Sequence, residues 1–166
     1  MAVTNRGSAT VALPSDTEIL ITRSFDAPRH LVYKACTTPE LIAKWWSGER
    51  GEVTSVEVDL RVGGTWRYVM VANEGFEVAF HGEYREIEPN ERVVSTEVFE
   101  GAPVEDPDLL GTLNTMTLAD HNDGTLLTTL VVCPNQYVRD MIIESGMEGG
   151  MQEAMDRLER VAQSLA

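Results

Sequence analysis

The chain has 166 residues, of which 43% are hydrophobic and 24% are charged, and its formal net charge is −14. This length suffices for one domain with a substantial core. The negative charge repels a phosphate backbone and no cluster of Lys and Arg offsets it locally, so we expect no nucleic-acid partner.

The first residues do not resemble a targeting segment. They lack the apolar stretch of a secretion signal, and no apolar run in the chain approaches the ~20 residues of a membrane-spanning helix. We therefore expect no membrane partner and a cytoplasmic location. Residues 1–16, polar and small, are predicted to form a flexible leader, and residues 17–166 a single domain. Cys36 and Cys133 lie far apart in sequence, which favours reduced thiols over a disulfide framework or a zinc site.

One strand and two short helices are predicted at the start of this domain. Residues 19–25 show the two-residue period of a strand. Asp26, placed as an acidic N-cap, predicts a helix over about residues 29–36. Thr38-Pro39 predicts the start of a second helix, which ends after Trp45-Trp46.

From residue 52 to residue 132 the hydrophobic period is two. Turn sequences interrupt it at Gly63-Gly64, at residues 88–91 and at residues 122–124. Residues 101–111 are rich in Pro, Gly and Asp and are predicted to be a loop. Successive hairpins imply a curved antiparallel sheet of about six or seven strands, and the chain after Asn135 is predicted to be helical.

The last helix is predicted over about residues 147–165. Met147, Met151 and Met155 recur every four residues and therefore lie on one face of it. At 1.5 Å per residue the helix is ~28 Å long. An antiparallel sheet has one face to bury, and this helix is the only large apolar element available to cover it. We predict that the sheet wraps around the helix and that the Met stripe is both core and the floor of a cavity.

Five segments between residues 18 and 165 are informative when taken together: RSFDAPRHLVYKACTTPELIAKWW, DLRVGGTWRYVM, FHGEYREIEPNERVV, DGTLLT and SGMEGGMQEAMDRLERV. They resemble the AHSA-type family of homologues of the activator of heat-shock-protein-90 ATPase. This family belongs to the START-related (SRPBCC) superfamily, which includes the birch-pollen allergen fold.

The resemblance implies an α+β helix-grip fold with a ligand-sized cavity between the sheet and the C-terminal helix. It does not imply one function, because family members include co-chaperones, carriers of lipids or small molecules, and enzymes. Gly150 and Met151 stand where the resemblance leads us to expect a bulkier aromatic residue, which would widen the cavity.

A candidate ligand pocket follows from strand alternation. The larger, partly aromatic face of the strand around Tyr68 is predicted to turn toward the helix. An apolar concavity with few polar groups is the usual form of a small-molecule site, and methionine adapts to irregular shapes. Simple core packing is the alternative for each residue, and Trp46 is interpreted either as a ligand gate or as a plug at the open end of the sheet. The candidate pocket comprises Trp46, Trp66, Tyr68, Met70, Phe80, Tyr84, Met116, Leu118, Met147, Met151 and Met155.

Catalytic and metal sites have little support. His30, His81 and His121 have no metal-ligand spacing, and the sequence has no nucleophile motif. We predict no metal, no cofactor and no catalytic residue. An enzyme of the cyclase, dehydratase or hydrolase type stays an alternative. It would draw its acid and base groups from Tyr68, Tyr84, Glu77 or Glu97.

The prediction for function is a binding protein for an apolar small molecule, held between the sheet and the C-terminal helix. The remaining alternative is a protein-interaction role, either activating a chaperone ATPase or acting in a stress response. Its partner would be a chaperone or a second copy of the chain.

Overall fold

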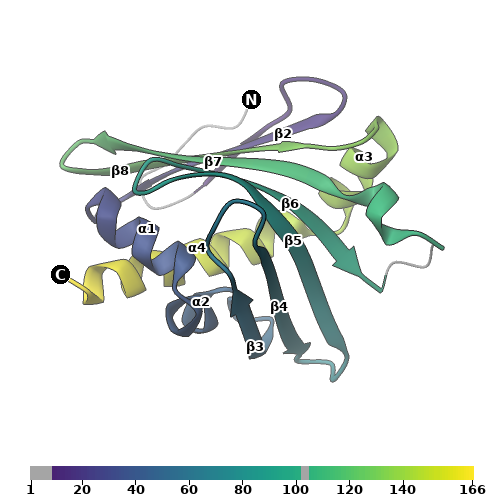
Figure 1. Ribbon diagram of the computed structural model, residues 1–166, viewed down its shortest axis with the longest axis horizontal. Helices are drawn as coiled ribbons and strands as arrows, with labels where there is room; N and C mark the ends of the chain where they lie inside the picture. The colour runs from purple at the N-terminus through teal and green to yellow at the C-terminus, as the bar shows by residue number, and fades with distance from the viewer. Residues whose placement is uncertain (1–8, 102–104) are drawn as a thin grey trace.

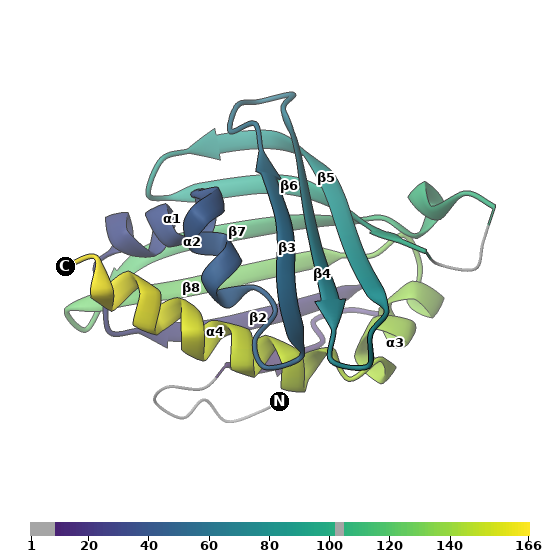
Figure 2. The ribbon, with the colours of Figure 1, turned by 90° about the horizontal axis from the view of Figure 1, so that it is seen from below.

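The computed structural model describes residues 9–101 and 105–166. A curved antiparallel sheet of eight strands, in the order β1-β2-β8-β7-β6-β5-β4-β3, lies over one long helix (Figures 1 and 2). The elements in chain order are β1 (Thr10–Ala12), β2 (Glu18–Phe25), α1 (Arg29–Thr37), α2 (Pro39–Trp45), β3 (Gly51–Val58), β4 (Thr65–Ala72), β5 (Glu77–Glu88), β6 (Arg92–Glu100), the 3-10 helix η1 (Pro107–Leu110), β7 (Thr112–His121), β8 (Gly124–Val132), α3 (Gln136–Glu144) and α4 (Met147–Ser164).

This arrangement confirms the predicted helix-grip fold, with one strand more than the six or seven expected. The additional strand is β1, which pairs with β2 through Thr10↔Thr22 and its neighbours. It lies inside the predicted leader, where it supplies partners to backbone groups at the outer edge of β2. Residues 1–8 of that leader lie outside the described residues, so its flexibility there stays a prediction.

Left-handed backbone at Asn and Asp confirms two of the predicted turns. Asn122 (φ 48°) and Asp123 (φ 63°) connect β7 and β8, whose last paired residues are His121 and Gly124. A two-residue turn with both φ values positive matches the twist of the strands that it joins. Asn90 (φ 67°) lies in the turn between β5 and β6. Asn and Asp tolerate this conformation better than most residues do.

The start of α1 differs from the prediction. Asp26 does not cap α1, because the N-cap residue is Pro28 and no side chain caps the helix; the Asp26 backbone N–H instead donates to Glu159 Oε2 in α4 (2.8 Å). The last helix, α4, spans Met147–Ser164 as predicted, and the helical residues before it form a separate helix, α3. Gly146, with φ 82°, separates α3 from α4, a conformation that favours glycine.

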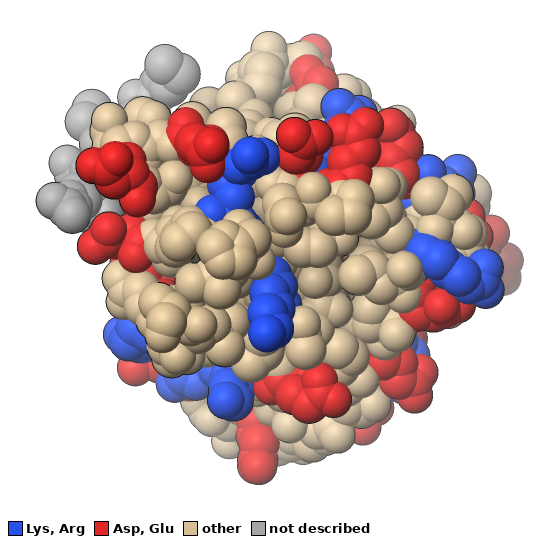
Figure 3. Space-filling model, turned by 60° about the vertical axis from the view of Figure 1, so that its left-hand side comes forward, with Lys and Arg blue, Asp and Glu red and all other residues tan. Residues whose placement is uncertain are grey.

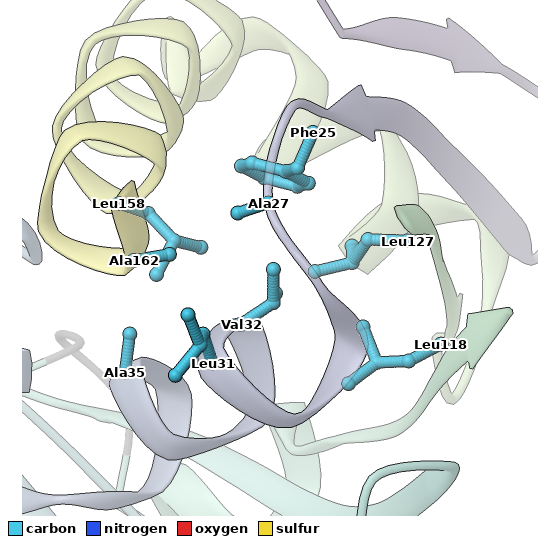
Figure 4. Close-up of a cluster of buried hydrophobic side chains, with 9 residues drawn as sticks. All are labelled: Phe25, Ala27, Leu31, Val32, Ala35, Leu118, Leu127, Leu158 and Ala162. Carbon is cyan, nitrogen blue, oxygen red and sulfur yellow. The ribbon is translucent and has the colours of Figure 1, made fainter. Parts of the chain in front are cut away.

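The main core joins α1 and α4 to the β2, β7 and β8 part of the sheet (Figure 4). Ala35 of α1 and Ala162 of α4 are fully buried at the contact between the two helices. Their small side chains let the helices approach closely. The buried residues of this cluster are Phe25, Ala27, Leu31, Val32, Ala35, Leu118, Leu127, Leu158 and Ala162.

An ion pair across the same interface ties the sheet to α4. Arg23 of β2 is only 1% exposed, and its Nη2 lies 3.2 Å from Asp156 Oδ1 and 3.3 Å from Glu159 Oε1. Its guanidinium also lies 4.7 Å from the centre of the Phe25 ring. A buried charge needs such partners, because transferring an ion from water into the protein interior costs roughly several kcal/mol of free energy. Arg23 thereby fixes which side of α4 faces β2.

Acidic and basic side chains are interspersed on the face seen in Figure 3. Ion pairs join several surface charges of the described residues, such as Arg29–Asp120 and Arg61–Asp59, both at 2.9 Å. The net charge of −14 is therefore not gathered into one patch on this face. Within the described part of the chain, no helix is long and apolar enough to cross a membrane.

We expect Arg23→Leu to lower the free energy of unfolding by about 2–3 kcal/mol, because the variant leaves Glu159 partly buried without its cation. Urea denaturation measures this change. Arg61→Leu, which breaks an exposed ion pair, is the matched control and should cost less than about 1 kcal/mol. The combination of Arg23→Leu with Glu159→Leu should recover part of the loss. Equal losses of stability in Arg23→Leu and Arg61→Leu would contradict a special role for Arg23.

Candidate functional site

Five aromatic side chains form a continuous series along the inner face of the sheet, four from its strands and one from the end of α2. We call them the aromatic wall: Trp46, Trp66, Tyr68, Phe80 and Phe99. The ring centres lie 4.7 Å apart for Trp66–Tyr68, 5.4 Å for Tyr68–Trp46, 5.7 Å for Trp46–Phe80 and 5.2 Å for Phe80–Phe99. Strand pairing explains the series, because Tyr68 is opposite Phe80 and Phe80 is opposite Phe99 in neighbouring strands. Directly paired side chains on one face lie in contact distance.

The wall changes from buried to exposed along its length. Trp66 is 6% exposed and Phe99 is 44% exposed, while Trp46, Tyr68 and Phe80 are half-buried. Large aromatic side chains are normally covered when they lie in a core. The accessible rings therefore form an apolar surface that is continuous with the core but not sealed by it.

The loop that follows α2 holds Trp46 against Tyr68 and Phe80. Arg50 Nε donates to Glu153 Oε1 of α4 (3.1 Å), and the Glu49 backbone N–H donates to the same oxygen (3.2 Å). The hydrogen bond from Arg50 lowers the pKa of the Glu153 carboxyl. These contacts fix the end of α2, and with it Trp46, relative to α4.

Polar groups meet next to the wall. The Tyr68 and Tyr84 hydroxyls lie close enough for each to influence the pKa of the other. Burial raises the pKa of Tyr68 well above 10 and that of Tyr84 to about 12, so both phenols stay protonated at neutral pH. The thiol of Cys36 in α1 is also close, and burial raises its pKa to about 12. None of these three groups is a reactive nucleophile in this state.

Glu97 of β6 is a carboxylate close to the Tyr68 hydroxyl. Its charge contributes to the raised pKa of Tyr68. Asn114 Nδ2 of β7 donates to Glu97 Oε1 (3.4 Å), and Thr112 Oγ1 donates to Asn114 Oδ1 (2.9 Å). Burial raises the pKa of the Glu97 carboxyl above its usual 4.5. A cluster of this kind gives an apolar surface a few fixed hydrogen-bonding groups.

Gly82 makes room for the buried end of the wall. A Cβ at this position would lie 1.8 Å from the Thr96 carbonyl oxygen and 2.6 Å from Trp66 Nε1. The indole of Trp66 therefore covers the glycine, and its buried Nε1–H has no hydrogen-bond partner among the described residues. A buried donor without an acceptor costs free energy, which a ligand acceptor at this point would recover.

The structure divides the predicted pocket residues into two groups. Trp66 and Tyr84 form one buried cluster with Val93, against which Tyr68, Phe80 and Met116 pack. Met147, Met151 and Met155 pack against a second cluster, which contains Ile19, Ile21, Val131 and Val138. Leu118 belongs to the main core, and Met70 is buried. Only the first group, with Trp46, lies along the aromatic wall; whether any of the eleven contacts a ligand stays a prediction.

Sequence reasoning did not place four residues at this site: Tyr33, Cys36, Phe99 and Asn114. Asn114 has the same strand parity as Met116 and Leu118, so the two-residue period contained the signal for its inward position. Tyr33 packs against both the main core and the Trp66 cluster. Its position depends on how α1 crosses the sheet, for which local sequence carries no signal.

His81 points away from the wall, as the alternation with Phe80 predicts. Its Nδ1 lies 2.9 Å from Glu100 Oε2, and Arg67 binds both oxygens of Glu100 at 2.9 and 3.0 Å. Arg67 and then His81 hold the pKa of the Glu100 carboxyl at about 2. No three His, Cys, Asp or Glu residues among those described are grouped to hold a metal ion.

Two hollows on the described surface lie elsewhere. One is lined by Tyr137, Asp140, Met141, Glu144 and Ser145 of α3 and the residue after it, and the other lies between α2 and β3. Neither includes a residue of the predicted pocket. The aromatic wall is therefore the candidate ligand site because of its side-chain chemistry and not because of either hollow.

Comparison with known proteins agrees with this architecture. Residues 26–163 match the model of the family described as Activator of Hsp90 ATPase homolog 1-like protein (AHSA1). The chain belongs to this family. The AHSA1-like fold accounts for the sheet, the long helix and the two short helices. A search of the curated proteins finds no match.

Solved structures with the same fold share little sequence with this AHSA1-like chain. A protein from Rhodobacter sphaeroides is 24% identical, with a TM-score of 0.84 and coverage of 94% of this chain and 99% of that one. One from Mycobacterium smegmatis is 23% identical, with a TM-score of 0.81 and coverages of 92% and 96%. An AHSA1-like protein from Aeromonas hydrophila is 21% identical, with a TM-score of 0.67 and coverages of 89% and 93%. At these identities the likeness concerns the fold alone.

We expect Gly82→Ala to lower the free energy of unfolding by about 2 kcal/mol or more, because the new Cβ overlaps the Thr96 backbone and the Trp66 ring. Gly150→Ala in α4 is the matched control. A Cβ there meets no atom within 4 Å, so higher helix propensity should raise stability by up to about 1 kcal/mol. Thermal and urea unfolding of both variants measure the difference. A neutral Gly82→Ala would show that Trp66 does not lie over this glycine.

The Glu100 network predicts a pH dependence. The pKa of Glu100 falls from its usual 4.5 to about 2 on folding, so its stabilising effect is present above 4.5 and disappears as the pH falls toward 2. Glu100→Gln should therefore cost about 1 kcal/mol at neutral pH, a modest value because the side chains are partly exposed. Urea denaturation at neutral and strongly acidic pH should show the gap between the variant and the natural protein closing on acidification. A constant gap would contradict this linkage.

Proposed function

We propose that this AHSA1-like protein binds a small, largely apolar molecule against the aromatic wall, on the inner face of the sheet. The observation that carries the proposal is the series of half-buried rings, Trp46, Tyr68 and Phe80, between buried Trp66 and exposed Phe99. Aromatic surface that stays accessible on a concave face favours contact with a ligand.

Polar groups beside the wall support the same proposal. Ligand sites are mostly apolar and contain a few convergent hydrogen-bonding groups that orient the bound molecule. The Tyr68–Tyr84 hydroxyl pair, Glu97 and the Nε1–H of Trp66 are such groups. In this proposal the Met residues of α4 hold the helix against the β2 side of the sheet, and their predicted role as a cavity floor is secondary.

An enzymatic function is the second candidate. Glu97 favours it, since a carboxyl with a raised pKa at neutral pH is a better general acid than an ordinary one. Glu77, the other carboxylate predicted for this role, is exposed, in a part of β5 where alternation directs it away from Phe80. If the natural protein converts a bound ligand and Glu97→Gln does not, the protein is an enzyme that uses Glu97.

The family description also names activation of a chaperone ATPase. A role of that kind would use an outer surface, such as α3 with its exposed Tyr137 and Met141. Stimulation of the Hsp90 ATPase by the purified protein, undiminished in Phe80→Ala, would favour this interaction role or the related stress-response role over ligand binding. The proposed compartment is the cytoplasm, where the free thiols of Cys36 and Cys133 stay reduced.

Native mass spectrometry of the purified protein is the first test. A small additional mass that disappears on denaturation identifies a bound molecule and its class. Phe80→Ala should then weaken binding of that molecule by about tenfold or more, because it interrupts the wall between Trp46 and Phe99. Phe76→Ala is the matched control. It removes an equally large ring that is 57% exposed in the β4–β5 turn, so this variant should bind the molecule with unchanged affinity. Equal affinities in the two variants would contradict the aromatic wall as the binding site.

A further inference from the structure

Glu97 faces the ligand side of the sheet. Along β6, Val93 packs with Trp66 and Tyr84, and Phe99 contacts Phe80, so these two residues define the inner face. Glu97 has the same parity and lies between them. Its partner Asn114 comes from the neighbouring strand β7, at a position that is also directed inward together with Met116.

The carboxylate of Glu97 has no cationic partner among the described residues. Its hydrogen bond comes from Asn114 Nδ2, and Asn114 is itself held by the buried Thr112 hydroxyl. The arginines on β4, β5 and β6 pair with other carboxylates: Arg67 with Glu100, Arg85 with Glu83 and Arg92 with Glu86. A carboxylate on a largely apolar face without a compensating charge is poorly stabilised in the ligand-free protein.

Resting on the proposed function, we propose that the ligand of the aromatic wall is an organic cation, an apolar molecule that carries a protonated amine, and that Glu97 binds its charged group. The faces of aromatic rings are electron-rich and attract ammonium groups. A charge-assisted hydrogen bond to the carboxylate adds to this attraction and fixes the orientation. The apolar part of the ligand lies along Tyr68, Phe80 and Trp46.

The charge of the whole molecule favours the same class of ligand. A net charge of −14 raises the local concentration of cations and lowers that of anions. A carboxylate ligand would meet the negative charge of Glu97, and it would need a proton on one of the two groups in order to bind. A neutral ligand would leave the Glu97 charge uncompensated. Only a cation provides the partner that the side chains of this chain do not.

Three naphthalene probes of similar size test this inference: 1-naphthylmethylamine, 1-naphthylmethanol and 1-naphthylacetate, which are cationic, neutral and anionic at neutral pH. Their affinities for the full chain are measured by calorimetry. We expect the amine to bind at least about tenfold more tightly than the other two, as a charge-assisted hydrogen bond implies. Glu97→Gln should remove this preference. Glu77→Gln, which makes the same change in charge at an exposed site, should retain it.

The outcomes separate the two proposals. If the three probes bind equally well, or if Glu97→Gln keeps the preference for the amine, the inference is overturned while binding to the wall stands. If none binds, both are overturned for ligands of this size. If Glu97→Gln fails to fold, as circular dichroism would show, acid titration of the natural protein decides. The affinity for the amine must then fall as Glu97 becomes protonated, with little change for the alcohol; a constant ratio between them rejects the inference.

Discussion

The inner face of the sheet is wider than the helix that lies against it. Eight strands at a spacing of about 4.8 Å extend over roughly 34 Å, whereas a helix with its side chains is about 10–12 Å across. Contacts of α4 and α1 with the sheet concentrate on β2, β7 and β8. The strip from β4 to β6 is therefore covered by large side chains instead of by α4: the rings of its own strands, Trp46 at the end of α2 and Tyr33 of α1.

The two parts of the inner face meet different physical requirements. Under α4, apolar packing supplies most of the stabilisation but does not fix direction, and the Arg23 ion pairs with Asp156 and Glu159 set the rotation of the helix. On the β4–β6 strip, edge-on contacts among rings hold the wall together while leaving part of each ring accessible. Because α4 is held firmly against the β2 side of the sheet, the rings on the β4–β6 strip can stay partly accessible.

Local sequence signals predicted the elements that depend on local chemistry. Turns with Asn90, Asn122 and Asp123 were predicted because left-handed backbone selects Asn, Asp and Gly. Strand β1 was missed because three residues carry no clear period, and its pairing depends on the open edge of β2. The partners of Arg23 lie 133 and 136 residues further along the chain, so the two-residue period of residues 19–25 predicted the strand but not what neutralises its arginine. For the same reason, the Met stripe and the aromatic residues were predicted as one pocket.

Arg23 and Glu97 are both charged side chains on the inner face of the sheet. Because of the position of α4, Arg23 is paired with carboxylates and Glu97 is not paired with a cation among the described residues. Arg23 lies under the helix, where water is excluded, and folding is compatible with its charge only because the helix carries carboxylates at the matching turn. Glu97 lies on the strip that α4 does not cover, where partial exposure allows it to remain without a cation. One helix on a wide sheet therefore produces a neutralised charge in the core and an uncompensated one beside an aromatic surface. That second arrangement recognises charge and apolar shape together, as a small organic cation requires.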